Sequence, residues 1–263
     1  MNTCVQDAFN LAWKLAFVVK GHAGPALLQT YNDERAPVGK QVVLRANQSR
    51  LDYAPLNACF RVPGADNPVK AGIERFRSPT PEGEAARLAV AKALDLKNSE
   101  FNAQGTEMNQ RYESSAVLPD TTMSPAPAPL DTQLHCHATT RPGAKIPHAW
   151  LANRNHDRIS TLDLVGHGAF TLITGLTGTV WAAAAANLNA AYLRTVVIGS
   201  PESQDVYCAW QNIREIDESG ALLVRPDGVV AWRQKSAAAT VAEAAQALTE
   251  ALHRALAQIF RDR

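Results

Sequence analysis

Residues 220–233 read GALLVRPDGVVAWR, and this stretch carries the clearest hairpin signal of the chain. Two apolar runs, 221–225 and 229–233, flank Pro-Asp-Gly at 226–228. Proline presets the backbone of a tight turn, aspartate bonds to the backbone ahead of it, and glycine accepts a positive φ. The stretch therefore predicts two antiparallel strands joined by a short turn.

The segments on either side of this hairpin extend the pattern to a complete domain. Residues 170–174 (FTLIT) and 193–199 (LRTVVIG) are typical of buried strands, and the alanine-rich run 181–188 between them predicts a helix. Because strand–helix–strand crossovers are right-handed, these two strands are expected to pair in parallel. Apolar residues at helical spacing from 241 to 259 predict a last helix.

This order, β-α-β followed by β-β-α, is that of a thioredoxin-like fold. A redox thioredoxin carries its cysteine pair between the first strand and the first helix, and here that segment reads LTGTVW at 176–181. Thiol chemistry is therefore not expected there. This half of the chain is interpreted as a packing or assembly module.

The N-terminal half reads as helices. The first runs from about 2 to 20 and ends at Gly21, and its apolar arc is wide enough to need cover on more than one side. Thr3 and Gln6 fit a capping box, and Asp7 places a negative charge in the first turn, where the helix dipole favours it.

Further helices are predicted at 25–43 and 82–96. Pro37 is expected to end or restart the first of them, because proline removes a helix hydrogen bond. Proline and glycine between 60 and 81 indicate loops, and 108–119 (MNQRYESSAVLP) is interpreted as a candidate strand.

Prolines at 125, 127 and 129 favour extended polyproline geometry and indicate a linker. The chain is accordingly divided into a helical domain at 1–118, a proline-rich linker at 119–132 and a thioredoxin-like domain at 133–263.

Composition excludes several classes of protein. A net charge of +1 argues against nucleic acid as the main partner. Four widely spaced cysteines suit a reducing compartment. Asp7, Asn10 and Lys14 interrupt the apolar N-terminal run, which therefore fits neither a signal peptide nor a membrane span, and a cytoplasmic protein is expected.

A series of sequence blocks in a fixed order resembles the flavin-dependent phenol hydroxylases, with the chlorophenol monooxygenases nearest. No single block is specific, but together they cover nearly the whole chain: MNTCVQDAFNLAWKL at 1–15, G-x-x-G-P-A-L-L-x-T-Y-x-x-E-R-x-P-V at 21–38, RYESSAV at 111–117, RPGAKIPHAWL at 141–151, STLDL at 160–164, FTLITG at 170–175 and RPDGVVAWR at 225–233.

The resemblance implies an α/β protein in which a helical C-terminal remnant of an FAD-binding monooxygenase domain precedes the thioredoxin-like domain. The family's G-x-G-x-x-G and G-D-A-x-H flavin motifs are not found in the 263 residues. The sequence is therefore expected to be the C-terminal part of such an enzyme, through truncation, a misplaced gene start or a frameshift.

The resemblance also implies a cofactor site. In the family, the residues that match Met1, Asn2 and Thr3 lie against the isoalloxazine ring of FAD. A helix N-terminus offers free N–H groups and a positive dipole end, which suit the negative charge of a reduced flavin. The alternative is that Asn2 only caps the helix.

Other polar residues have structural interpretations beside functional ones. Gln6 and Asp7 are expected to serve the first turn of the helix rather than a ligand. Tyr31, Glu34 and Arg35 are expected to form a helix-end salt bridge and an aromatic anchor. Tyr112 is expected to be a buried tyrosine with a bonded hydroxyl, or to approach a substrate channel.

No catalytic residue and no metal site is assigned. His135, Cys136 and His137 are adjacent, so their side chains point to opposite sides of an extended chain. His148, His156 and His167 show no carboxylate partner at useful spacing, and a G-x-S-x-G elbow is absent from the sequence.

The resemblance predicts an FAD-dependent, NAD(P)H-using monooxygenase that hydroxylates a phenolic substrate ortho to its hydroxyl group, as a homodimer with neither membrane nor nucleic-acid partners. This chain alone is expected to be inactive. The alternative function is a non-catalytic thioredoxin-like dimerisation or interaction module.

Overall fold

The computed structural model describes residues 2–120 and 131–258. The chain divides into two compact units, which are Met1–Pro37 with Asn109–Pro127 and His137–Arg263, and Val38–Met108 with Ala128–Cys136. These units do not coincide with the predicted domains, because residues 1–37 pack with the sheet. Of the predicted linker, Pro125, Pro127 and Pro129 lie outside the described residues.

The first unit contains a four-stranded sheet in the order β4-β3-β5-β6. Its strands are β3 (Phe170–Gly175), β4 (Leu193–Ile198), β5 (Ala221–Val224) and β6 (Val230–Gln234). Strand β3 pairs in parallel with β4 and antiparallel with β5, and β5 pairs antiparallel with β6. Helix α7 (Thr179–Leu188) joins β3 to β4, and α9 (Val241–Ala255) follows the hairpin. The predicted α/β fold is confirmed.

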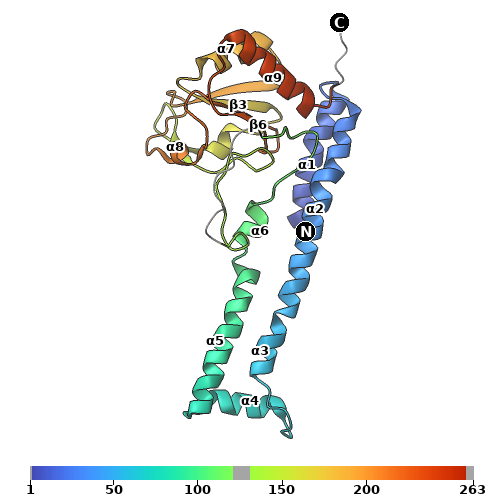
Figure 1. Cartoon of the computed structure of the whole chain (residues 1–263), viewed down its shortest axis with the longest axis vertical. Helices are drawn as coiled ribbons and strands as arrows, with labels where there is room; N and C mark the ends of the chain where they lie inside the picture. Colours follow the sequence, from blue (N-terminus) through green and yellow to red (C-terminus); the bar gives the residue numbers. More distant parts are fainter. Residues whose placement is uncertain (1, 121–130, 259–263) are drawn as a thin grey trace. The chain divides into compact units, whose positions relative to one another are not determined.

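The two faces of the sheet build two apolar cores, because successive side chains of a strand point to opposite faces. On one face, Phe170, Leu172 and Leu223 pack under α7 and α9, which lie together over the sheet in Figure 1. On the other face, Ile173 and Leu222 pack with residues of α8 (Ala209–Ile213) and of the preceding loops.

Small elements of the second face are too short for sequence periodicity to predict. A two-stranded sheet forms from β1 (Trp150–Ala152) and β2 (Arg158–Ser160), and the 3-10 helix η2 (Thr161–Leu164) follows it. Ser160 and Asp163 form a capping box at the start of η2. These elements cover the face opposite α7 and α9.

Helix α1 (Asn2–Val19) belongs to the core of the sheet unit. Trp13 and Phe17 each meet Phe170 edge-to-face at 5.7 Å between ring centroids. Gly21 ends the helix in the left-handed backbone conformation, with φ +72°. The 3-10 helix η1 (Pro25–Leu28) then buries Leu27 in the same core.

The expectation that Pro37 interrupts the next helix is wrong. Helix α2 runs without a break over Gln29–Leu51, with Pro37 inside it. The missing N–H costs one backbone hydrogen bond. Glu34 and Arg35 on the preceding turn form buried polar contacts, and Val38 is buried after it, so tertiary packing holds both sides of the proline in the helix.

The second unit adds α3 (Tyr53–Cys59), α4 (Pro68–Arg77), α5 (Pro81–Phe101) and α6 (Gln104–Met108). Helix α4 corrects the expectation of loops at 60–81. Its start signals are present in the sequence, since the side chain of Asn67 accepts a hydrogen bond from the Lys70 amide and Pro68 occupies the first turn.

The candidate strand at 108–119 is also wrong. In this segment only an isolated bridge between Arg111 and Ala144 has strand character among the described residues. The chain instead turns at Ser114, whose carbonyl accepts from the Val117 amide. Leu118 then bonds to the carbonyl of Ala231 at the edge of the sheet.

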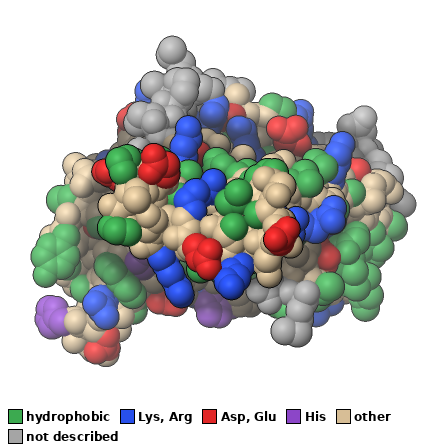
Figure 2. All heavy atoms as spheres, turned by 90° about the horizontal axis from the view of Figure 1, so that it is seen from below, with side chains coloured by type: hydrophobic (Ala, Val, Ile, Leu, Met, Phe, Trp, Pro, Cys, Tyr) green, Lys and Arg blue, Asp and Glu red, His purple; other side chains and the backbone are tan. Residues whose placement is uncertain are grey.

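The surface mixes charges of both signs. On the face that Figure 2 shows, lysine and arginine side chains alternate with aspartate and glutamate, with apolar side chains between them. Among the described residues, no helix is both long enough and apolar enough to cross a lipid bilayer.

Candidate flavin site at the start of helix α1

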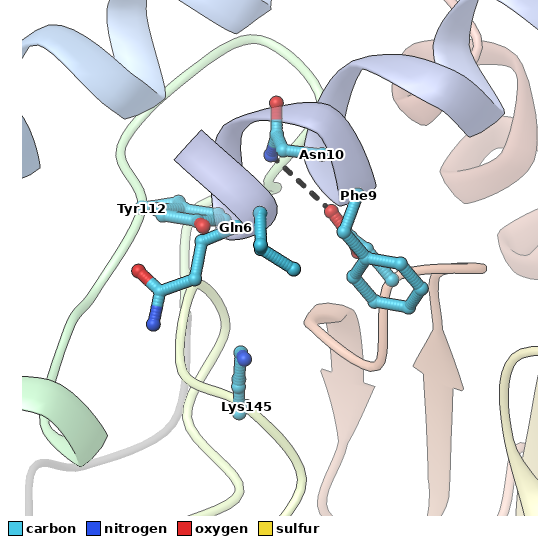
Figure 3. Close-up of a pocket in the computed structure, with 7 residues that line it drawn as sticks. Gln6, Phe9, Asn10, Tyr112 and Lys145 are labelled. Carbon is cyan, nitrogen blue, oxygen red and sulfur yellow. Dashed lines mark hydrogen bonds between the residues drawn. The ribbon is translucent and has the colours of Figure 1, made fainter. Parts of the chain in front are cut away.

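The first turns of α1 border a pocket of about 140 Å³. Figure 3 shows Gln6, Phe9 and Asn10 projecting from the helix, with Tyr112 and Lys145 on loops opposite. Val5 and Phe9 are 66% and 56% exposed and form an apolar wall. The start of α1 is therefore not enclosed by the core that buries its other end.

Two of the three predicted cofactor residues lie at this end of the helix. Met1 is outside the described residues, Asn2 is the first residue of α1, and Thr3 is half-buried in its first turn. Among the described residues, the first turn of α1 holds no acidic side chain, so Asp7 lies one turn later than predicted and leaves the free N–H groups of the helix start without a carboxylate in their own turn. These features suit a negatively charged ligand edge.

The size of the pocket limits what this chain can hold. A pocket of about 140 Å³ is smaller than a complete FAD molecule, so it would border only part of the cofactor.

The inner wall of the pocket leads into a buried group of four charges, Lys14, Glu34, Arg225 and Asp227, which we term the charge cluster. Their side chains are between 0 and 3% exposed. Lys14 comes from α1, Glu34 from α2, and the other two from the turn after β5. The two positive and two negative charges balance.

Glu34 is the centre of the cluster. Its carboxylate accepts a two-pronged bond from the Arg225 guanidinium at 2.6 and 2.9 Å and a third bond from Lys14 Nζ at 2.8 Å. Ser114 Oγ donates to the same carboxylate at 2.6 Å. Such forked arginine–carboxylate pairs fix orientation as well as distance.

Asp227 extends the cluster toward α1. It accepts from Arg225 Nε at 3.0 Å and from the indole N–H of Trp13 at 3.1 Å. The amide nitrogen of Asn10 donates to Asp227 at 3.3 Å and to Glu34 at 2.7 Å. Asn10 therefore joins both carboxylates and also lines the pocket (Figure 3).

Burial and charge shift the pKa values within the cluster. Burial lowers the pKa of Lys14 to about 8, since Glu34 offsets only part of the cost of desolvating its ammonium group. Burial alone would raise the pKa of Glu34, but Arg225 and Lys14 outweigh it and lower that pKa to about 2. The pKa of Arg225 is raised by both carboxylates, against the effect of burial.

These shifts predict a pH dependence of stability. Glu34 protonates near 4.5 when unfolded and near 2 when folded, so its contribution is present above about pH 4.5 and is lost as pH falls toward 2. The loss amounts to roughly 3 kcal/mol. The pKa of Lys14 is also lower in the folded state, so its effect has the same sign and raises stability as pH rises from 8 to 10.5.

Urea unfolding of the whole chain from pH 2 to 10.5 measures how the free energy of unfolding changes with pH in both windows. The Glu34→Gln variant serves as control, because it lacks the titrating carboxyl and is expected to lose most of the acid slope. An unchanged acid slope in that variant would contradict the assignment to Glu34.

A second polar group holds the other side of the helix start. Arg35 donates to Asp7 at 2.7 Å, to Gln6 at 3.2 Å and to the hydroxyl of Tyr112 at 2.9 Å. Gln6 and Asp7 thus have a partner beyond their own helix turn. Tyr112 is buried with a bonded hydroxyl, as predicted, and burial raises its pKa.

The predicted helix-end salt bridge of Glu34 and Arg35 is wrong in its place, because Glu34 pairs with Arg225 and Arg35 with Asp7. Both form ion pairs, yet they lie inside α2 rather than at a helix end, because the helix continues to Leu51. Arg225 and Asp227 were not predicted as site residues, since the Pro-Asp-Gly motif explains them as a turn. The polar Asn10 and Lys14 on an apolar helix were the available signal.

The remaining singled-out residues do not gather at this pocket. His135 and Cys136 are exposed and His137 is half-buried. His148 Nδ1 lies 2.7 Å from Ser160 Oγ, and His156 and His167 occupy turns with positive φ. Within residues 2–120 and 131–258, no three His, Cys, Asp or Glu side chains are placed to hold a metal ion.

Comparison with known families identifies the parts that meet at the charge cluster. Residues 139–258 match the family model described as aromatic-ring hydroxylase, C-terminal. Residues 1–46 match the FAD binding domain model, so Lys14 and Glu34 lie in one matched segment and Arg225 and Asp227 in the other.

Individual proteins agree with this hydroxylase assignment. The chain is 44% identical over 238 residues to 2,4-dichlorophenol 6-monooxygenase of Delftia acidovorans, covering 88% of this chain and 40% of that protein. It is 44% identical over 241 residues to phenol 2-monooxygenase of Pseudomonas sp. strain EST1001, covering 89% and 39%. The resemblance to the flavin-dependent phenol hydroxylases is confirmed, and the chain spans about 40% of the length of these relatives.

Solved structures place the same fold in a flavoprotein. The flavin-dependent monooxygenase PieE, in complex with FAD and substrate, superposes with a TM-score of 0.87 at 40% identity, over 98% of this chain and 44% of that one. An aklavinone-11 hydroxylase with FAD and aklavinone has a TM-score of 0.66 at 32% identity, over 98% and 40%.

Proposed function

We propose that the chain supplies the C-terminal part of an FAD-dependent, NAD(P)H-using monooxygenase that hydroxylates a phenolic substrate ortho to its hydroxyl group. The observation that carries this proposal is the open, carboxylate-free start of α1, held against the hydroxylase C-terminal domain by buried charges. The relatives' names, dichlorophenol and phenol monooxygenase, support a monocyclic phenol as substrate.

The contribution of this chain is electrostatic and positional. FAD, when bound, supplies the oxygen-transfer chemistry. The backbone amides at Met1, Asn2 and Thr3 would donate to the flavin edge that carries negative charge, and the dipole of α1 would stabilise that charge. The aromatic core at the other end of the helix keeps these donors in place.

The chain alone is expected to hold FAD weakly and to hydroxylate nothing, because only residues 1–46 match the FAD binding domain model and the chain spans about 40% of the length of its relatives. Titration with FAD followed by flavin fluorescence, and an assay of phenol-dependent NADPH oxidation, measure both properties. Stoichiometric yellow flavin after purification, together with phenol-dependent oxidation, would contradict this expectation.

A chimeric enzyme tests the proposed function itself. In it, residues 1–263 replace the aligned part of the Delftia dichlorophenol monooxygenase. The chimera is expected to bind FAD and to oxidise NADPH or NADH in the presence of a phenol. A folded chimera without bound flavin would refute the proposal, and an apolar control such as Tyr207→Ala, on an exposed side chain, should leave both properties unchanged.

The proposal includes a homodimer in the cytoplasm. The alternative, a non-catalytic thioredoxin-like interaction module, also predicts self-association, so sedimentation alone does not separate the two. Flavin binding by the chimera distinguishes the two functions, because an interaction module would not use the start of α1 to bind flavin.

A further inference from the structure

The charge cluster joins segments that lie far apart in the sequence. Glu34 and Arg225 are separated by 191 positions, and Asn10 and Asp227 by 217. Through these bonds the turn after β5, in the hydroxylase C-terminal domain, contacts both α1 and α2. All of these residues belong to one compact unit.

Stability alone does not explain four buried charges. Removing charges from water costs several kcal/mol per ion, and apolar replacements of similar volume are often as stable. A forked arginine–carboxylate pair adds direction, which an apolar contact lacks. The cluster is therefore suited to fix how α1 is oriented rather than how strongly it is held.

The geometry transmits this orientation to the open end of the helix. Trp13 and Asn10 of α1 both bond to Asp227, and Asn10 is 1% exposed. Asn10 lies eight residues from Asn2, or about 12 Å along the helix axis at 1.5 Å per residue. A tilt at Asn10 would displace the amides at the helix start.

We infer that Arg225 and Asp227 are positioning residues for the flavin-facing start of α1, acting through Asn10, Trp13 and Glu34. This inference rests on the proposed function for the role of that helix start. The C-terminal domain then contributes to the flavin site without touching the flavin.

Hydrogen exchange of the full chain without FAD tests the inference. Asp227→Asn is expected to speed exchange of amides 6–13 at least tenfold more than exchange of the α9 amides. Asp120→Asn is the matched control, because Asp120 is also buried and accepts from Arg233 at 2.8 Å on β6. Asp120→Asn is expected to leave the ratio between α1 and α9 unchanged.

A second variant covers the case in which Asp227→Asn does not fold. Asn10→Ala removes the bridge between the two carboxylates but leaves both paired with Arg225. It is expected to raise the ratio of exchange rates between the α1 amides and the α9 amides at least severalfold. Equal acceleration of α1 and α9, or none, in the folded variants would overturn the inference. Because FAD is absent, this outcome is independent of the chimera, whose failure to bind flavin would refute the proposed function instead.

Discussion

Glu34→Gln is expected to lower the free energy of unfolding by about 3–5 kcal/mol. The substitution keeps the shape of the side chain but leaves Arg225 and Lys14 buried without their shared carboxylate. Urea unfolding at pH 7 measures the loss. The pair Arg254–Glu250 is half-exposed, so Glu250→Gln should cost less than about 1 kcal/mol.

A double variant tests whether the unbalanced buried charge causes this loss. Lys14→Met with Glu34→Gln removes one charge of each sign, so it is expected to be more stable than Glu34→Gln alone. A loss below about 1 kcal/mol for the single variant would show that the cluster is not energetically coupled as its distances indicate.

Phe170→Ala is expected to cost about 3–5 kcal/mol, because its ring is fully buried and fills the space between the sheet and α1. Trp13 and Phe17 would both lose an edge-to-face partner. Thermal or urea unfolding measures the effect. Tyr207→Ala is the control, since that side chain is 84% exposed and should change stability by less than about 0.5 kcal/mol.

The Phe170 result also bears on the place of α1 in the fold. If α1 were merely laid on the surface, its amides would exchange no faster in the alanine variant. A loss confined to less than about 1 kcal/mol would contradict the packing of α1 into the sheet core.

Local patterns predicted most of the sheet domain. The apolar run at 170–174 and the turn at 226–228 carry their own signals, so β3, β5 and β6 lie within one residue of the predicted strands. The expected helix break at Pro37 was wrong, because it rested on local backbone geometry alone. The contacts of Glu34 and Arg35 that hold the helix there come from residues far away in the sequence. The start of α4 was missed although Asn67 and Pro68 carry a capping signal.

The candidate site was also predicted only in part. The helix start at 2–3 was predicted through a resemblance, and its role stays a prediction. Arg225 and Asp227 could not be assigned to it, since their partners Glu34, Asn10 and Trp13 lie about 190 to 217 positions away. A buried charge cluster has no sequence pattern, because its members meet only after folding. The sequence signal for such a cluster is a polar residue on an otherwise apolar helix, such as Lys14.

The central claim is that the start of α1 faces the flavin while its far end is fixed in the C-terminal domain. Hydrogen exchange of the chimera with and without FAD tests it most directly. FAD is expected to slow exchange of the amides at 3–6 at least tenfold and to leave the amides of α7 and α9 unchanged. Bound FAD that leaves residues 3–6 unprotected would contradict the claim.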